Sequence, residues 1–109
     1  MLKLDVKNRN KAWLMDNYFH YDPKRSNDGE RMYGYSFPVW RSGDFITLEA
    51  KISVILETGK VQTDVYDTSF KGRYAPYYMK PSYYEPLLDK IRVKIEDKYK
   101  TFGIREEDE

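Results

Sequence analysis

The sequence predicts a single α+β domain, in which an antiparallel meander of three or four strands is covered by a C-terminal helix and accompanied by a short N-terminal helix. A chain of 109 residues has room for one hydrophobic core. Apolar and polar side chains alternate within residues 45–65, and apolar side chains recur at helical spacing within residues 83–103. The predicted parts are an N-terminal helix and polar loop (1–31), an antiparallel sheet (32–70), a Tyr- and Pro-rich loop (71–82), the covering helix (83–103) and an acidic tail (104–109).

The strongest pattern in the chain is the alternation from Ile46 to Leu56, where every second residue is apolar and most of the intervening ones are polar. This period of two is typical of a strand with one face on the core and one face in water. Residues 31–40 and 61–65 show the same period, and the turns at 42–44 and 57–60 each contain a glycine. Strands joined by short turns pair antiparallel. Because a sheet with one apolar face needs a covering element, we expect the meander to pack against the helix.

Single residues predict where the helices begin or end. Asn8 is the candidate N-cap of the first helix, which we expect to run to Tyr18 after a short strand near residues 2–6. We expect the second helix to end at Gly103, with Ile104 folding back in a Schellman-type close.

Composition narrows the class of protein. The chain has no Cys, which excludes disulfides and thiolate ligands and fits a reducing compartment. No apolar run approaches the roughly 18 residues of a membrane span, and no apolar signal segment follows Met1. We therefore expect a cytoplasmic protein without a membrane segment.

Aromatic residues make up 17% of the chain and include 11 Tyr, so we expect many half-buried rings in the core and its rim.

The residues that catalysis needs are largely missing. His20 is the only His, and no Ser lies in a Gly-x-Ser-x-Gly or similar elbow. His20 and Asp22 are two potential metal ligands without an evident third, and the glycines form neither a P-loop nor a dinucleotide fingerprint. We therefore expect no catalytic, metal-binding or cofactor-binding residues, and a protein that is not an enzyme.

One fragment keeps an enzymatic alternative open. Glu49 and Lys51 resemble the Glu-x-Lys strand signature of restriction-type nucleases, in which carboxylates hold Mg²⁺ and the Lys steadies the attacking water. Asp44 precedes them by five residues, but in a regular strand it points to the opposite face. We favour the other interpretation, a charge pair across a solvated sheet face. A Mg²⁺-dependent nuclease is the third hypothesis.

The loop before the C-terminal helix has the composition of a protein interface. Within residues 71–84, five Tyr crowd around two Pro, with Met79 and cationic side chains beside them. Tyr, Met and Arg are enriched at interfaces, although the same rings are also suited to plug the end of a small core. The predicted partner-binding residues are Arg73, Tyr74, Tyr77, Tyr78, Lys80 and Tyr83.

A second candidate surface is basic. Lys90, Lys94 and Lys98 lie four residues apart on the predicted helix, and residues 71–100 carry eight basic and four acidic side chains. Like charges at this spacing weaken a helix slightly unless an external anion compensates, which makes the three lysines candidates for nucleic-acid binding. The alternative is a solvated helix face, since the net charge of +1 is far below that of typical nucleic-acid binders.

Several segments between Tyr33 and Ile104 follow one another in a recognisable order. They are residues 44–56, 59–61 and 65–67, then Tyr74, then residues 84–91, which read Tyr-Glu-Pro-Leu-Leu-Asp-Lys-Ile. This order resembles the YjbR/MmcQ-like proteins, in particular the domain in the N-terminal half of their YyaQ-type members. The resemblance implies a compact α+β fold with a double-wing arrangement, likened to a phage transcription factor domain, and it suggests DNA binding. Likeness of fold alone does not establish function.

These observations predict a non-enzymatic binding domain that acts through a protein partner. We expect a regulatory, accessory or inhibitor role in bacteria or their mobile elements, which is a general expectation for small single domains rather than one drawn from particular residues. Nucleic-acid binding through the basic helix and the Tyr-rich loop is the alternative.

Overall fold

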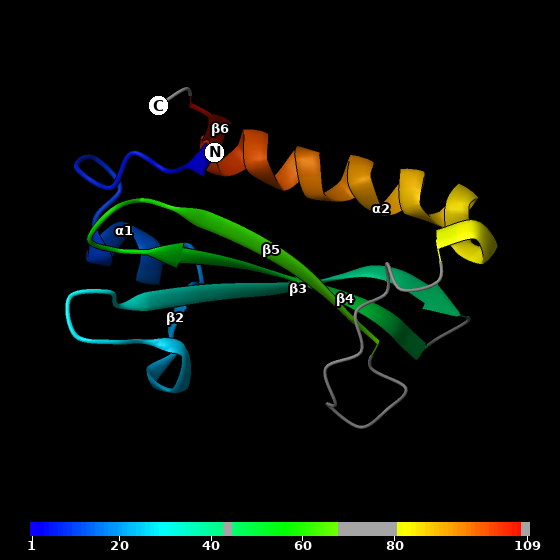
Figure 1. Ribbon diagram of the computed structural model, residues 1–109, viewed down its shortest axis with the longest axis horizontal. Coiled ribbons are helices and arrows are strands. Elements are labelled where there is room, and N and C mark those ends of the chain that lie inside the picture. Colours follow the sequence, from blue (N-terminus) through cyan, green and yellow to red (C-terminus); the bar gives the residue numbers. More distant parts are fainter. Residues whose placement is uncertain (43–44, 68–80, 108–109) are drawn as a thin grey trace.

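In the computed structural model, the backbone is described for residues 1–42, 45–67 and 81–107, and within these ranges the side chains of residues 42, 45–47, 67 and 81–88 are left out. The elements are β1 (Leu2–Lys3), α1 (Lys11–Asp16), β2 (His20–Tyr21), the 3₁₀-helix η1 (Pro23–Arg25), β3 (Met32–Ser42), β4 (Phe45–Ile55), β5 (Val61–Asp67), α2 (Pro81–Phe102) and β6 (Arg105–Glu106). Figure 1 shows α2 lying along one face of a twisted sheet. The predicted α+β class, with an antiparallel sheet and a C-terminal helix, is confirmed.

The main sheet is a meander of four strands in the order β2-β3-β4-β5, and each neighbouring pair is antiparallel. Its register places Tyr35, Ile52 and Thr63 side by side, one on each of the three long strands. This face lies toward α2, and Ile52 and Val54 on it are fully buried. The period of two along β4 therefore predicted correctly which of its faces is covered.

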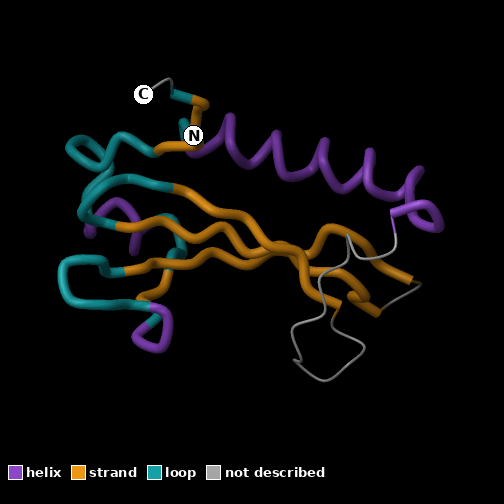
Figure 2. Tube along the Cα trace, viewed as in Figure 1, coloured by secondary structure: helices purple, strands orange, loops and turns teal. Residues whose placement is uncertain are grey.

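A second, two-stranded sheet joins the two ends of the chain. β1 pairs antiparallel with β6, with Leu2 opposite Glu106 and Lys3 opposite Arg105, and Figure 2 shows both ends of the trace beside the C-terminal end of α2. Lys3 also forms a bridge to Lys60, just before β5, which attaches this small sheet to the main one. We expected a strand near residues 2–6 but not its partner, because two-residue strands leave no periodic pattern.

The first helix is shorter than expected and is capped by a different residue. The side-chain oxygen of Asn10 accepts a hydrogen bond from the Trp13 N–H at 3.2 Å, which makes Asn10 the N-cap. Asn8 instead donates to Asp5 at 2.7 Å in the preceding turn. The helix ends at Asp16 and therefore has six residues.

The second helix begins two residues before its expected start and ends where expected. Proline is well suited to the first helical turn, where its missing N–H has no helical partner to bond, and α2 begins at Pro81. Gly103 follows the helix with a φ of 76°, and the Ile104 N–H donates to the Tyr99 carbonyl at 2.8 Å, which confirms the Schellman-type close. Of the helices in the described ranges, none combines the length and the apolar content that a membrane span requires.

The outer edge of β3 is only partly covered. β2 is two residues long and pairs with Tyr33 and Gly34, so among the described residues the rest of β3 has no strand partner on that side. Pro38 lies within this stretch, and the register with β4 shifts on both sides of Trp40. Proline offers no backbone N–H, and a bulge bends the strand, so both features interrupt the edge.

Replacing Ile52 by Asp tests which face of β4 is covered. Ile52→Asp places an unpaired charge in the core and should lower the free energy of unfolding by about 3 kcal/mol or more. Ser36 is exposed on the opposite face of β3 and provides the control, because Ser36→Asp should change stability by less than about 0.5 kcal/mol. Urea denaturation measures both variants, and equal losses would contradict the assignment.

Candidate functional site

The face of the sheet away from α2 carries a network of ion pairs. Lys51 Nζ lies 3.1 Å from Asp22 Oδ2, and the two side chains are only 26% and 16% exposed. Arg25 crosses the same face, donating to Ser53 Oγ at 3.1 Å and lying 3.6 Å from Asp64 Oδ2. We expected Lys51 to pair with a charged residue of a neighbouring strand on a solvated face. Lys51 instead pairs with Asp22, outside the strands, because the segment that follows β2 folds over this face.

The network bears on the nuclease hypothesis. Glu49 lies on the same face as Lys51, as the alternation requires. The Lys51 ammonium, however, is engaged by Asp22, and Asp44 lies outside the described residues. Within the described ranges, no three His, Asp or Glu side chains are grouped closely enough to share a metal ion. The nuclease hypothesis thus gains no geometric support from this face.

The predicted partner-binding loop falls outside the part of the chain that the structure describes. Arg73, Tyr74, Tyr77, Tyr78 and Lys80 are among the residues left out, and the Tyr83 side chain is also left out, although its backbone belongs to α2. The interface role of this loop stays a prediction.

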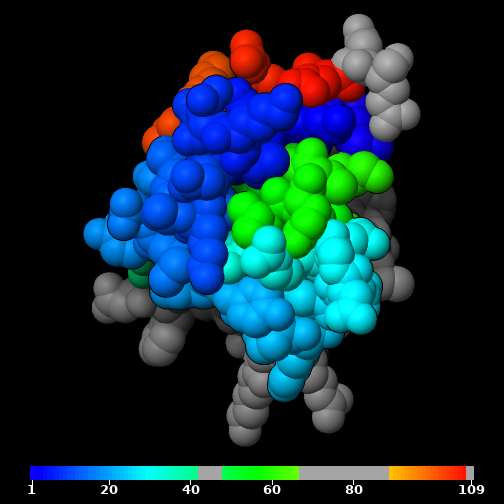
Figure 3. All heavy atoms as spheres, turned by 90° about the vertical axis from the view of Figure 1, so that its left-hand side faces the viewer, coloured from blue at the N-terminus to red at the C-terminus, as the bar shows by residue number. Residues whose placement is uncertain are grey.

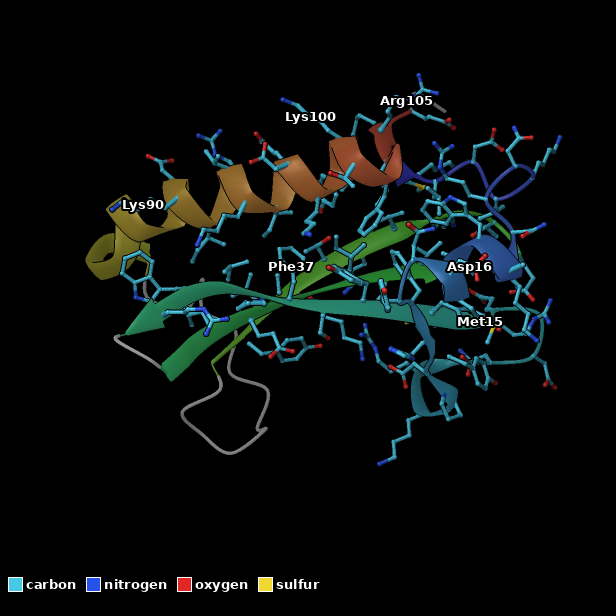
Figure 4. All side chains as sticks on the ribbon, turned by 180° about the vertical axis from the view of Figure 1, so that it is seen from behind. Met15, Asp16, Phe37, Lys90, Lys100 and Arg105 are labelled. Carbon is cyan, nitrogen blue, oxygen red and sulfur yellow. The ribbon has the colours of Figure 1, made fainter. Side chains whose placement is uncertain are left out.

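The lysines predicted to bind nucleic acid lie beside aromatic rings of the sheet. Lys98 Nζ is 5.5 Å from the ring centroid of Tyr35 and 5.7 Å from that of Phe37. Lys90 Nζ is 5.6 Å from the ring centroid of Trp40. Figure 4 shows Phe37 between the sheet and α2. A cation over a ring face is attracted to it, so these contacts link α2 to the sheet.

The outer side of α2 mixes charges of both signs. Lys94, the middle lysine of the predicted stripe, is exposed. Arg92 lies 3.3 Å from Asp89, one turn away, and both side chains are mostly in water. Lys100 extends from the same helix on the side away from the sheet (Figure 4). The described part of α2 therefore matches a solvated helix face more closely than a continuous phosphate-binding stripe.

A feature that sequence reasoning missed lies at the end of α1. Tyr18 has a φ of 66°, in the left-handed region where Gly is the usual residue. The Tyr18 N–H donates to the Met15 carbonyl at 3.2 Å, and the Phe19 N–H donates to the Leu14 carbonyl at 2.9 Å, as in a Schellman motif. α2 ends with the same pair of hydrogen bonds but has Gly103 at the equivalent position. The chain thus places a bulky ring where glycine has the lower energy.

Tyr18 is one of three exposed apolar residues spaced three apart along the chain, Met15, Tyr18 and Tyr21, which we call together the α1–β2 patch. These side chains are 57%, 73% and 50% exposed, and they are three of the five exposed large apolar side chains in the described part of the chain. Figure 3 shows the end of the molecule that α1 and residues 20–31 form together with the turn before β5. An exposed apolar surface at one end of a domain is a candidate interaction site.

A pocket of about 430 Å³ opens beside this patch, within the size range of ligand-binding pockets. Its apolar part combines the buried rings of Phe19 and Tyr33 with the exposed Met15 and Tyr21 of the patch. The other described residues that line it are Lys11, His20 and Arg31, so this described lining includes no Asp or Glu.

Glu57 holds Arg31 at the pocket. One carboxylate oxygen of Glu57 accepts from Arg31 Nε and the other from the Arg31 backbone N–H, both at 2.7 Å. The side-chain hydrogen bond between them raises the pKa of Arg31 and lowers the pKa of Glu57, so both groups are charged at neutral pH. This pair uses only one of the five guanidinium N–H donors. Its other guanidinium donors lie outside this pair, on a side chain that is 52% exposed.

Comparisons with known proteins identify no relative. No protein-family model matches the chain, and searches of the curated proteins and of the solved structures found no significant match. The resemblance to the YjbR/MmcQ-like proteins, and the DNA binding that it suggests, therefore stay predictions. The candidate site rests on geometry alone.

The ion pair on the polar face should make stability depend on pH. Burial opposes the charge on Asp22, but the hydrogen bond and charge of Lys51 outweigh it, so the pKa of Asp22 lies below its ordinary value of 3.8. Its contribution is therefore complete above about pH 4 and is lost as the pH falls through the lower, folded-state pKa. At pH 7, Asp22→Asn should lower the free energy of unfolding by about 1–3 kcal/mol. Urea denaturation from pH 7 to pH 2 should show this difference shrinking in acid, and a constant difference would contradict the assignment.

The lysines of α2 should differ in their effect on stability. Lys98→Gln removes a cation from two ring faces and should lower the free energy of unfolding by about 0.5–1 kcal/mol. Lys94 is exposed and provides the matched control, because Lys94→Gln should change stability by less than about 0.5 kcal/mol. Denaturation with urea compares the two variants. Equal effects would show that the contact of Lys98 with the rings contributes nothing.

Proposed function

We propose that this chain is a cytoplasmic, non-enzymatic binding domain that acts through a protein partner, with the α1–β2 patch as part of its interface. The observation that carries the proposal is Tyr18, a large ring that is 73% exposed at a backbone position suited to glycine. A regulatory, accessory or inhibitor role in bacteria or their mobile elements fits a small domain that works by binding.

The energetic cost of Tyr18 favours a role in binding rather than in the stability of the fold. A residue with a side chain in the left-handed region costs about 1 kcal/mol relative to the ordinary helical region. The exposed ring gains little from burial within the domain to offset this cost. Met15 and Tyr21, three residues before and after it, are exposed as well, and Met and Tyr are residue types that interfaces enrich. Strained residues of this kind concentrate at sites of function.

The alternative, nucleic-acid binding, is less well supported by the described residues. Its candidate cations Lys90 and Lys98 lie over rings of the sheet, which competes with phosphate contact. The Tyr-rich loop stays a second predicted contact region for the protein partner. Tyr77→Ala and Tyr78→Ala test it in the assay described next.

Tyr18→Gly separates binding from folding. Glycine relieves the backbone strain but gives the unfolded chain more freedom, so the two effects offset each other and stability should stay within about 1 kcal/mol of the parent. Tyr18→Asn checks this with a residue that tolerates the same φ. Partner capture from a lysate of the native source, measured on the same preparations, should fall about 10-fold or more, which corresponds to about 1.4 kcal/mol.

Val93 provides the control for this experiment, because it is an exposed apolar residue on α2, outside the patch. Val93→Ser should keep full capture. If Tyr18→Gly and Tyr18→Asn fold normally and also capture normally, the patch is not the interface. Repeating the capture after nuclease treatment distinguishes a protein partner, which is retained, from an association that depends on nucleic acid.

A further inference from the structure

We infer that the pocket beside the α1–β2 patch receives a bulky apolar side chain flanked by carboxylates, presented by an acidic segment of the partner protein. This inference rests on the proposed function and adds the chemistry of the partner. It follows from the lining of the pocket, from the way in which Arg31 is held, and from the extent of the apolar surface outside the pocket.

The lining combines an apolar interior with cationic residues. Phe19 and Tyr33 are buried and offer ring surface that a bulky apolar side chain can cover. Lys11 and Arg31 line the same pocket, and its described lining residues include no Asp or Glu. Glu57 beside Arg31 carries one negative charge, so the two cations still outweigh it. An apolar group that enters this pocket therefore arrives beside positive charge, which favours a neighbouring carboxylate over a neighbouring ammonium.

Arg31 is already arranged for such a carboxylate. Its Nε is bound by Glu57 at 2.7 Å, and the second oxygen of Glu57 is bound to the Arg31 backbone. Both oxygens of Glu57 are thus engaged with Arg31. A partner that uses a guanidinium already held at one end avoids part of the entropy cost of ordering a long side chain on binding.

The surface outside the pocket favours a polypeptide over a free small molecule. Tyr18 does not line the pocket, yet it is the most exposed of the large apolar side chains described. A small molecule that fills the pocket leaves Tyr18 in water, whereas a polypeptide that continues beyond the pocket covers it. The 430 Å³ of the pocket suits one anchoring side chain with its neighbours rather than a whole element of structure.

A peptide series tests the inference on the intact chain. The probe is a blocked pentapeptide with a central Phe between pairs of Glu, and its variants carry Gln or Lys in place of Glu, or Ala in place of Phe. Titration followed by ¹H–¹⁵N NMR should give saturable shifts in α1, β2 and the start of β3. The Gln peptide should bind about 5- to 10-fold more weakly, and the Lys and Ala peptides should bind more weakly still.

Two variants test the role of the cation. Arg31→Gln should bring the affinities for the Glu and Gln peptides close together. Arg92→Gln removes a cation from the exposed side of α2 and should leave the preference unchanged. Equal binding of the Glu and Gln peptides to the parent chain, or no saturable shift with any peptide, would overturn the inference.

Free phenylacetate, a small molecule with an aromatic ring and a carboxylate, tests whether the pocket binds a small molecule rather than a polypeptide segment. If phenylacetate binds as tightly as the Glu peptide, the pocket is a small-molecule site and the inference fails. The proposed function is tested separately by Tyr18→Gly: loss of capture with that variant, together with failure of every peptide, would retain the protein interface and reject only the acidic segment.

Discussion

Three aromatic rings hold the separate parts of this domain together. Phe19 follows α1, Tyr35 lies in β3 and Phe102 ends α2, and their ring centroids are 5.1–5.5 Å apart. Two of these three contacts are edge-to-face, an arrangement that adds about 0.5–1.5 kcal/mol per pair beyond burial. Trp13 brings α1 itself into the cluster, 5.9 Å from Phe102. The cluster therefore packs both helices and the sheet into one unit.

The candidate site depends on the same cluster. Phe19 is almost fully buried, and it also lines the pocket. Because Tyr18 precedes Phe19 directly, burial of one ring fixes the backbone that turns the other ring toward solvent. The α1–β2 patch is thus positioned by the core and by a closed helix end. Binding groups supported in this way lose less freedom on complex formation than groups on a mobile loop.

Much of the sheet could be predicted from the sequence because its determinants are local. The period of two in β4 specifies which face is covered, and Gly103 marks the end of α2 through its own backbone freedom. The polar face could not be predicted, since Lys51 and its partner Asp22 are 29 residues apart. The candidate site was missed for a different reason. Tyr18 occupies a position where glycine is expected, so no capping signal marks it.

The interruptions along the edge of β3 disfavour strand addition by a second copy of the chain. A continuous strand edge is a template on which a second copy can add its own strand, and this process can continue into fibrous aggregates. Along the part of β3 that has no strand partner among the described residues, Pro38 removes one donor and the irregularity around Trp40 shifts the register. A second chain that approaches this edge meets an interrupted row of N–H and C=O groups. These interruptions oppose polymerisation through a long, aromatic-rich strand at the margin of the sheet.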